Sequence, residues 1–452
     1  MRVLLPMAFL AGAVLAASAL AAPALAGGQD GVLSGKQAFG DWQQDKPGVR
    51  RLIRPQDLQK PDPAQSSTNG ADAAARPKGA VPLLPLGFSA KLIASGIAGP
   101  RVVRIAPNGD LFVSDSRRDR VLVYRLGKDG RKAERSVFAD GLNQPYGIAF
   151  YPADKPQWVY VANADSVVRF PYRDGEMKAS GEPEMIISDI PANHHWTRDI
   201  VFSPDGKTLY LSVGSGSNVA EGMADRPQGG LDKWLASAAP GAAWDSEKGR
   251  AEVRAYDPDG RNGRVFATGL RNCSGMTVQP ATGKLWCVVN ERDGLGDNVP
   301  FEYATTVKEG AFYGWPWYYI GDHEDPRHAG ERPDLAGMVT VPDVLMQAHS
   351  APLNIAFYTG GNFPAEYEGD AFVALHGSWN RGKRTGYKVV RLRFKDGKPT
   401  GEYEDFMTGF VVSDARVWGR PVGVAVAKDG SLIVSEDGNG TLWQVTYKQG
   451  AQ

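Results

Sequence analysis

Six segments of the chain share one pattern, in which an apolar strand is followed by a turn of the Pro-x-Gly kind and then by a second apolar strand. Apolar runs of about four to eight residues that flank such turns predict β-hairpins. The copies begin at residues 102, 147, 199, 275, 354 and 423 and read VVRIAPNGDLFVSD, GIAFYPADKPQWVYVAN, DIVFSPDGKTLYLSVG, GMTVQPATGKLWCVVN, NIAFYTGGNFPAEYEGDAFVAL and GVAVAKDGSLIVSED.

Each of these units is predicted to hold four antiparallel strands, because further strand-like segments lie between the copies: VLVYRL (121–126), AEVRAYDPDG (251–260) and YKVVRLRF (387–394). Such sheets repeated around an axis form an all-β, six-bladed β-propeller, which buries sheet faces against neighbours and leaves only short edges. An open pair of β-sandwiches is the rival architecture, but it gives no reason for six similar units.

The first and last units differ from the others. After TLWQVTY (441–447) the last unit has only three strands, whereas FSAKLIASGI (88–97) lies ahead of the first unit without a partner. We expect these two segments to pair, so that an N-terminal strand closes the ring.

The first residues, MRVLLPMAFLAGAVLAASALAAPALA, combine an early arginine, an apolar run and a small-residue ending, which is typical of a secretory signal. We expect a signal peptide at 1–26, an N-terminal extension with an Ala/Pro-rich linker at 27–86, and the six-bladed propeller at 87–450. The mature protein is expected to be periplasmic or secreted. Stable membrane insertion is not expected, because no later stretch approaches the ~20 apolar residues of a membrane helix.

Charge and cysteine content narrow the possible partners. Lys+Arg and Asp+Glu both total 51, so no overall basic field attracts nucleic acid. Cys273 and Cys287 are the only cysteines; export permits a disulfide, but the sequence leaves their pairing open. The CxxCH haem motif is absent, so any electrons that this chain takes up must leave to a separate carrier.

Polar residues gather just before the first strand of each repeat. The innermost strands of a propeller run in one direction, so these positions converge on one face near the axis. Several arginines and amides that face one cavity favour an anion site. A histidine beside them, with an ordinary pKa of about 6.5, exchanges protons at neutral pH and is available as a base. The converging residues include Arg101, Asn143, Gln144, His194, His195, Arg198, Arg271, Asn272, His349 and Arg420.

Two metal sites can be weighed from residue types. The 290–298 loop, NERDGLGDN, is rich in oxygen ligands and glycine, which suits a hard cation, chiefly calcium, although its spacing is not that of an EF-hand. A zinc site at His194 and His195 is disfavoured, because no third or fourth His or Cys ligand is evident. Taken singly, a loop arginine or an Asp/Gly/Asn loop is more often structural than functional.

Three stretches together resemble the soluble PQQ-dependent sugar dehydrogenases, most closely their L-sorbosone dehydrogenase-like branch. The resemblance covers residues 87 to 447 and is carried by HHWTRDIVFSPDGKTLYLSVGSGSN, ATGLRNCSGMTVQPATGKLWCVVNERDGLGDNVP and GAFYGWPW. The segment AFGDWQQDKPGVRR (38–51) also resembles that branch. It implies a six-bladed propeller that holds pyrroloquinoline quinone (PQQ) and calcium on its top face. It also implies oxidation of the aldehyde or hemiacetal carbon of a sugar.

The resemblance assigns roles residue by residue. His195 matches the catalytic base, which takes a proton from the substrate hydroxyl while hydride moves to the quinone. Arg271 matches the arginine beside the quinone oxygens, where it stabilises negative charge during reduction. The remaining cofactor-binding matches are Gln144, Asn272 and Arg420.

The resemblance also places calcium in the 290–298 loop. Asp293 and Gly294 match the backbone-carbonyl ligands of the cofactor-bound ion, whereas Asp297 and Tyr313 fall near a second, structural ion.

This chain departs from the family pattern at three places. His194 stands where glucose-oxidising relatives carry Asp, so another group must orient His195, and Asp199 is a candidate. The family's cofactor-contacting lysine matches Ser378–Lys383, where Asn380 or a nearby cation is expected to substitute. Trp418 stands near the position of a second carboxylate-binding arginine.

Three functions are therefore compared. The first is PQQ-dependent oxidation of an aldose or an aldehyde sugar such as sorbosone, with electrons passed to an external cytochrome or quinone. The second is a calcium-dependent sugar lactonase or other hydrolase, which would use a side-chain-ligated metal and would not need Arg271 and Arg420 together. The third is a non-catalytic binding propeller, for which the convergence of His195 and the arginines would be chance.

Overall fold

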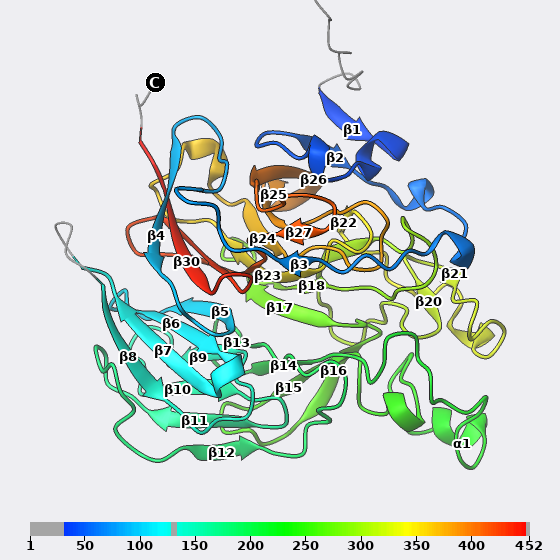
Figure 1. Cartoon of the computed structure of the whole chain (residues 1–452). Helices are drawn as coiled ribbons and strands as arrows, with labels where there is room; N and C mark the ends of the chain where they lie inside the picture. Colours follow the sequence, from blue (N-terminus) through cyan, green and yellow to red (C-terminus); the bar gives the residue numbers. More distant parts are fainter. Residues whose placement is uncertain (1–30, 128–132, 449–452) are drawn as a thin grey trace, which may run out of the picture.

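Six antiparallel sheets arranged in a ring make up the computed structural model, which describes residues 31–127 and 133–448 (Figure 1). The expected signal peptide at 1–26 lies outside these residues. Each sheet forms one blade around four strands that mostly follow one another along the chain, as the repeats predict.

Blades 1 to 3 occupy the first half of the ring. Their strands, from the inside outward, are β5 (Pro100–Ile105), β6 (Leu111–Asp115), β7 (Arg120–Arg125) and β8 (Glu134–Ala139); β9 (Ile148–Tyr151), β10 (Trp158–Ala162), β11 (Val167–Pro171) and β12 (Glu184–Ile187); and β13 (Ile200–Phe202), β14 (Leu209–Val213), β15 (Glu252–Tyr256) and β16 (Arg264–Thr268).

Blades 4 to 6 complete the ring. Their strands are β17 (Cys273–Val278), β18 (Leu285–Val289), β19 (Glu302–Thr306) and β22 (Val344–Met346); β23 (Pro352–Phe357), β24 (Ala371–Leu375), β25 (Lys388–Lys395) and β26 (Lys398–Met407); and β28 (Pro421–Val426), β29 (Leu432–Glu436), β30 (Thr441–Tyr447) and β4 (Phe88–Ala94).

The ring is closed as predicted. β30 pairs antiparallel with β4, with Leu442 opposite Ala94 and Tyr447 opposite Phe88. The innermost strands contact one another in the circular order β5, β9, β13, β17, β23 and β28, and β28 contacts β5. All six innermost strands are the first strands of the predicted hairpins, so the predicted six-bladed propeller is confirmed.

The glycine that begins several repeats allows the innermost strands to approach one another. A Cβ atom at Gly147 would lie 2.7 Å from the carbonyl oxygen of Arg198, and one at Gly275 would lie 2.5 Å from that of Leu353. Real Cβ atoms do not come so close to backbone atoms, so only glycine fits where the strands crowd around the axis. The second strands show the other side of this packing: all five residues of β18 are buried, because both faces of the sheet are covered by neighbouring blades.

The N-terminal extension lies along the propeller surface. β2 (Arg50–Leu52) pairs antiparallel with β26 and β1 (Val32–Ser34) pairs parallel with β2, so blade 5 has six strands. Arg51 is fully buried there and contacts Asp405 at 2.7 Å and Asp45 at 2.9 Å. Farther along, β3 (Asp72–Ala73) pairs parallel with β27 (Arg416–Val417), and a separate hairpin joins β20 (Tyr318–Tyr319) to β21 (His323–Glu324).

Helical structure is scarce in the described residues. They hold one short α-helix, α1 (Leu231–Leu235), and none of their helices has the length and apolar character needed to span a membrane. The 3₁₀ helices are Gly35–Phe39, Trp42–Gln44, Pro55–Asp57, Pro63–Gln65, Ser116–Arg118, Asp245–Glu247, Pro333–Leu335 and Ala365–Tyr367.

Candidate functional site

A cavity of about 310 Å³, which we call the histidine cavity, lies at the end of the ring where the innermost strands begin. Blades 3, 4 and 5 supply its walls, mainly through loops that precede their first strands or follow their second strands, with Glu302 added from the start of β19. Its size is within the range of ligand sites, about 300–1,000 Å³. The lining residues are His194, His195, Asn218, Arg271, Asn290, Glu291, Asp293, Glu302, His349, Ala351 and Trp379.

His195 is held through one ring nitrogen. Its Nδ1 lies 2.8 Å from Ser215 Oγ and 3.1 Å from the Ser215 carbonyl oxygen. The Ser215 hydroxyl donates to the Ser217 carbonyl at 2.6 Å, so both Ser215 oxygens act as acceptors toward the histidine. Nδ1 must therefore carry the proton, which leaves the lone pair on Nε2.

The loop before β13 that carries both histidines is clamped by two buried arginines. Arg198 Nη1 donates to the His195 carbonyl at 2.7 Å, and Arg250 Nη2 donates to the same oxygen at 2.9 Å and to the Ser215 carbonyl at 2.7 Å. His194 has a positive φ of 60°. Because the loop is not extended at this point, both imidazoles line the cavity, with ring centroids 4.3 Å apart.

The environment keeps His195 neutral. Burial lowers the pKa of its imidazole well below the usual value, and the positive charges of Arg271 and His194 lower it further. A neutral imidazole with a free Nε2 can accept a proton at physiological pH, which is the property that a general base needs.

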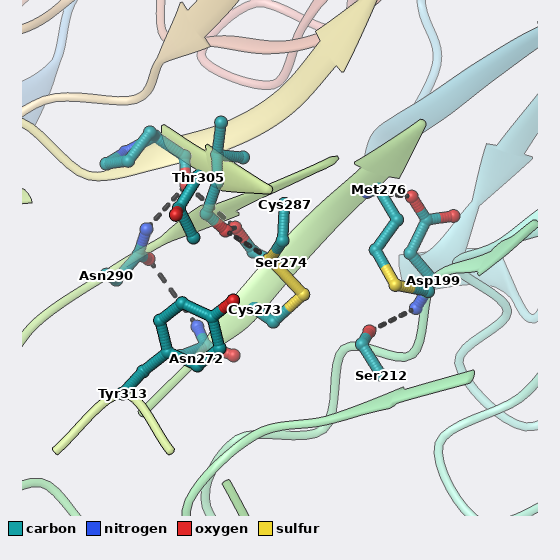
Figure 2. The surroundings of a disulfide bond; sticks show 12 residues. Asp199, Ser212, Asn272, Cys273, Ser274, Met276, Cys287, Asn290, Thr305 and Tyr313 are labelled. Carbon is teal, nitrogen blue, oxygen red and sulfur yellow. Dashed lines mark hydrogen bonds between the residues drawn. A yellow bond between two sulfur atoms is a disulfide. The ribbon is translucent and has the colours of Figure 1, made fainter. Parts of the chain in front are cut away.

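Arg271 and Asn272 precede β17, and Arg271 lines the histidine cavity whereas Asn272 is not among the lining residues. The buried guanidinium of Arg271 donates to the carbonyls of Asn290 at 3.0 Å and Glu291 at 2.8 Å and to Asn218 Oδ1 at 2.7 Å. Asn272 Nδ2 lies 3.5 Å from Asn290 Oδ1 (Figure 2). The next residue, Cys273, forms a disulfide with Cys287 of β18, which resolves the pairing that the sequence left open (Figure 2).

Three carboxyl groups line the cavity on the side of blade 4. Glu302 accepts the Glu291 N–H at 2.8 Å, and burial, with the nearby Glu291 and Asp293 charges, raises the pKa of Glu302 well above its usual value. Burial also raises the pKa of Glu291 to about 7. Asp293 Oδ1 contacts His349 Nδ1 at 3.0 Å. This wall carries a surplus of acid groups that a bound cation would neutralise.

The residues matched to the two calcium ions lie in different surroundings. Asp293 lines the histidine cavity, and Gly294 lies beside it with its N–H donating to Asn380 Oδ1 at 3.1 Å. The Asp297 carboxylate instead accepts the N–H groups of Ser67 at 3.1 Å and Gly382 at 2.8 Å, whereas the Tyr313 hydroxyl contacts Thr306 and Lys308. Within the described residues no three His, Cys, Asp or Glu side chains are arranged to hold a metal ion.

Arg420 and Gln144 do not line the histidine cavity. Arg420 Nη2 lies 3.0 Å from His376 Nδ1. The backbone N–H of His376 donates to the carbonyl of Ala351, which is a lining residue. Arg420 is therefore one residue removed from the wall, and its buried Nε has no partner in the described part of the chain. Gln144 is exposed on the blade 2 side and has a φ of 47°.

The expected substitutes for the family's lysine point elsewhere. Asn380 bridges two segments, since its Oδ1 accepts from Gly294 and its Nδ2 donates to the Ser67 carbonyl at 2.9 Å. Arg381 donates to the Phe39 carbonyl at 2.6 Å in the N-terminal extension. Neither side chain is among those that line the histidine cavity.

Comparison with known proteins identifies the family. The TrAA12-like family model matches residues 82–308 and 334–448. The chain belongs to the TrAA12-like family.

Named relatives of this TrAA12-like chain are found in bacteria and fungi. An uncharacterized protein of Borreliella burgdorferi is 31% identical over 382 residues, which cover 81% of this chain and 91% of the relative. The pyrroloquinoline quinone-dependent pyranose dehydrogenase of Coprinopsis cinerea is 24% identical over 80% of this chain, and the match spans about half of that relative, 54%.

Two solved structures share the fold of this chain. The iodide structure of the Trichoderma reesei family AA12 enzyme has a TM-score of 0.66 at 22% identity, covering 81% of this chain and 98% of that one. The holo form of the Coprinopsis cinerea pyranose dehydrogenase PQQ domain has a TM-score of 0.64 at 22% identity, covering 83% and 99%.

The TrAA12-like match begins at residue 82, so it excludes a segment that holds the site loops together. We call residues 62–70 the strap. The strap binds the 290–298 loop, which carries Asp293, and the 376–384 loop, which carries Trp379. Its hydrogen bonds include Asp62 N to Leu295 O (2.8 Å), Gly296 N to Ser66 Oγ (2.8 Å), Asn69 N to Trp379 O (2.7 Å), Asn69 Nδ2 to Gly382 O (2.9 Å) and Arg384 Nη2 to Asn69 Oδ1 (3.0 Å).

Sequence reasoning missed the group that orients His195. Asp199 was the candidate, and it is wrong: its carboxylate is buried against Arg104 at 2.9 Å and the Met276 N–H at 2.8 Å. Ser215 has the role instead. Ser215 lies in the loop that follows β14, the second strand of blade 3. The 290–298 loop follows the second strand of blade 4, so the same position in blade 3 could have been searched for site residues.

Proposed function

We propose that this chain is a periplasmic or secreted PQQ-dependent dehydrogenase that oxidises an aldose or an aldehyde sugar such as sorbosone. Electrons leave to an external acceptor, a cytochrome or a quinone. The observation that carries the proposal is that His195 and Arg271 line one cavity, with His195 neutral and its Nε2 free to act as base.

The donor set of the histidine cavity fits an anionic quinone together with a divalent cation. Trp379 lines the cavity with an indole that is 48% exposed, and an exposed aromatic plate suits a planar ring system. Arg271, which lines the cavity, supplies positive charge for carboxylates. Glu291, Asp293 and the loop carbonyls supply the oxygen atoms that calcium prefers.

These residues divide the work of oxidation. Bound PQQ would supply a hydride acceptor, and calcium would polarise its reactive carbonyl. His195 Nε2 accepts the proton of the substrate hydroxyl, while Ser215 holds the ring in the tautomer that leaves Nε2 basic. Arg271 provides fixed positive charge where negative charge develops, and its bonds to the Asn290 and Glu291 carbonyls keep it in place.

Reconstitution of the purified protein tests the proposal. The apoprotein is incubated with PQQ, calcium, both or neither, and reduction of an artificial electron-acceptor dye is followed with a panel of aldoses, aldehyde sugars and neutral polyols. We expect dye reduction only when both additions and an oxidisable sugar are present. Equilibrium dialysis of PQQ measures binding separately from turnover.

The same assay separates the alternatives. Hydrolysis of sugar lactones without PQQ would replace the proposal by a lactonase function. Absence of both PQQ binding and lactone hydrolysis would leave a binding propeller. His195→Asn that binds PQQ and retains full turnover would remove the histidine from the mechanism.

A further inference from the structure

A second cavity, of about 470 Å³, lies between the N-terminal extension and the propeller, and we call it the extension cavity. The 3₁₀ helices near residues 35–44 form one wall, and residues 297–298 and 381–383 form the other. Its residues differ from those of the histidine cavity, and its extension wall lies before residue 82, where the family match begins. The charged and amide groups that matter for its chemistry are Lys36, Asp41, Asp297, Asn298, Arg381 and Lys383.

Arg381 is the unusual group in this wall. Arg381 is 5% exposed, yet its guanidinium forms no ion pair with a carboxylate of the described residues. Nη2 donates to the Phe39 carbonyl, and the buried Nη1 has no hydrogen-bond partner in the same part of the chain. A buried guanidinium without a directly paired carboxylate is costly, and burial lowers the pKa of Arg381 although the charge of Asp297 opposes this effect.

The nearby acids Asp297 and Asp41 raise the pKa of Arg381 through their charges, but neither forms an ion pair with its guanidinium. Both Asp297 oxygens accept backbone N–H groups, from Ser67 and Gly382. Asp41 Oδ1 accepts the Gln43 N–H at 2.9 Å and caps the 3₁₀ helix Trp42–Gln44. Lys36 adds an exposed ammonium to the wall, and Lys383 adds another that contacts Asp414 at 3.0 Å.

An unmet acceptor lies in the same wall. Asn298 Oδ1 is buried and has no donor among the described residues. A ligand that completes this cavity must therefore bring oxygen acceptors for the cations and at least one hydroxyl donor for the amide oxygen. Leu33 and Phe39 add apolar surface, which suits the carbon chain of such a molecule.

We propose that the extension cavity is a binding site for a small hydroxycarboxylate, whose carboxylate pairs with Arg381 and Lys36 and whose hydroxyl donates to Asn298 Oδ1. The site is separate from the histidine cavity, and its existence does not depend on the quinone assignment. It is built by the extension, so the extension gives this chain a ligand site in addition to the propeller's own.

Calorimetric titration of the full chain with D-gluconate tests the site. Glucitol, the neutral polyol of the same length, and sulfate, an anion without hydroxyl groups, are titrated in parallel. We expect gluconate to bind more tightly than either. Arg381→Gln should weaken gluconate binding at least about tenfold, because the variant loses the charge-assisted hydrogen bonds to the carboxylate.

Lys36→Gln provides a second variant, because Lys36 is exposed and its loss does not threaten folding; it should also weaken binding, by less than the arginine variant. Lys46→Gln is the matched control, since Lys46 is exposed in the same extension but does not line the cavity, and its affinity should equal that of the wild type. Absence of gluconate binding to the wild type would overturn the proposal. So would equal affinity in the wild type, Arg381→Gln and Lys36→Gln, or equal affinity for gluconate, glucitol and sulfate.

Discussion

His195 Nδ1 lies 2.8 Å from Ser215 Oγ, whose own hydrogen is directed to the Ser217 carbonyl. This relationship sets the tautomer of the imidazole, because an oxygen that has already donated its hydrogen can only accept. The basic nitrogen is therefore Nε2, and the chemistry of the cavity depends on a serine two residues beyond the end of β14.

Removal of the imidazole should abolish most turnover. His195→Ala is expected to lower kcat by about a hundred- to ten-thousand-fold, which is the usual contribution of a positioned general base. Ser215→Ala should give a smaller loss, because the carbonyl of residue 215 still accepts from Nδ1. Both variants are assayed with saturating PQQ and calcium, and circular dichroism checks the fold. Equal kcat in the wild type and His195→Ala would contradict the assignment.

The acid limb of the pH profile should lie below the usual pKa of histidine. The pKa of His195 is lowered by burial and by the charges of Arg271 and His194, so the ring stays neutral and active as pH falls through 6.5. His194→Gln removes one of these charges, so the limb should move to higher pH. The measurement is kcat/KM against pH, supported by NMR titration of the His195 ring in the apoprotein. A shift to lower pH in His194→Gln would contradict the electrostatic explanation.

The strap should control the order of the 376–384 loop. Asn69→Ala removes the hydrogen bond that Asn69 donates to the Gly382 carbonyl and the one that it accepts from Arg384. The buried guanidinium of Arg384 is then partly unsatisfied, which lowers the stability of the folded state by about 1–3 kcal/mol. Amide hydrogen exchange in that loop should speed up, and PQQ should bind more weakly.

A matched control for the strap exists in blade 1. Asn108 is exposed in the β5–β6 turn and also makes two hydrogen bonds through its side chain, both with Asp110. Asn108→Ala should leave exchange in the 376–384 loop and PQQ affinity unchanged. Equal exchange rates in the wild type and Asn69→Ala would show that the strap does not order the loop, whatever the outcome for PQQ.

The disulfide should stabilise blade 4. Cys273 and Cys287 are 14 residues apart, and a bridge that closes a loop of about 15 residues contributes about 3 kcal/mol. The double variant Cys273→Ala/Cys287→Ala should therefore unfold at a lower urea concentration than the oxidised wild type. Treatment of the wild type with a reductant should give the same change. An unchanged midpoint after full reduction would contradict the prediction.

The propeller was predictable from sequence because its repeats carry their own signals. Each hairpin has apolar strands on both sides of a turn, and the incomplete last unit requires a partner strand, which FSAKLIASGI supplies. The extension was harder to place. The strap has no apolar periodicity, and most of its hydrogen bonds use backbone groups, on which residue type leaves little trace.

The site was predictable in position more than in detail. His195 and Arg271 precede innermost strands, and the ring brings both to one cavity. Arg420 also precedes such a strand, but its direction is decided by His376, which contacts it from a different blade. A contact of this kind depends on loop conformation, and a single sequence does not encode loop conformation in a readable pattern.

The pairing of β4 with β30 also bears on how the protein is made. The two strands are far apart in the sequence, at residues 88–94 and 441–447. During synthesis, β4 therefore has no partner strand until residue 447 has left the ribosome, while the earlier blades can already pair locally. The nascent chain therefore exposes the unpaired edge of β4 until β30 is made, and we expect a chaperone to bind at that edge.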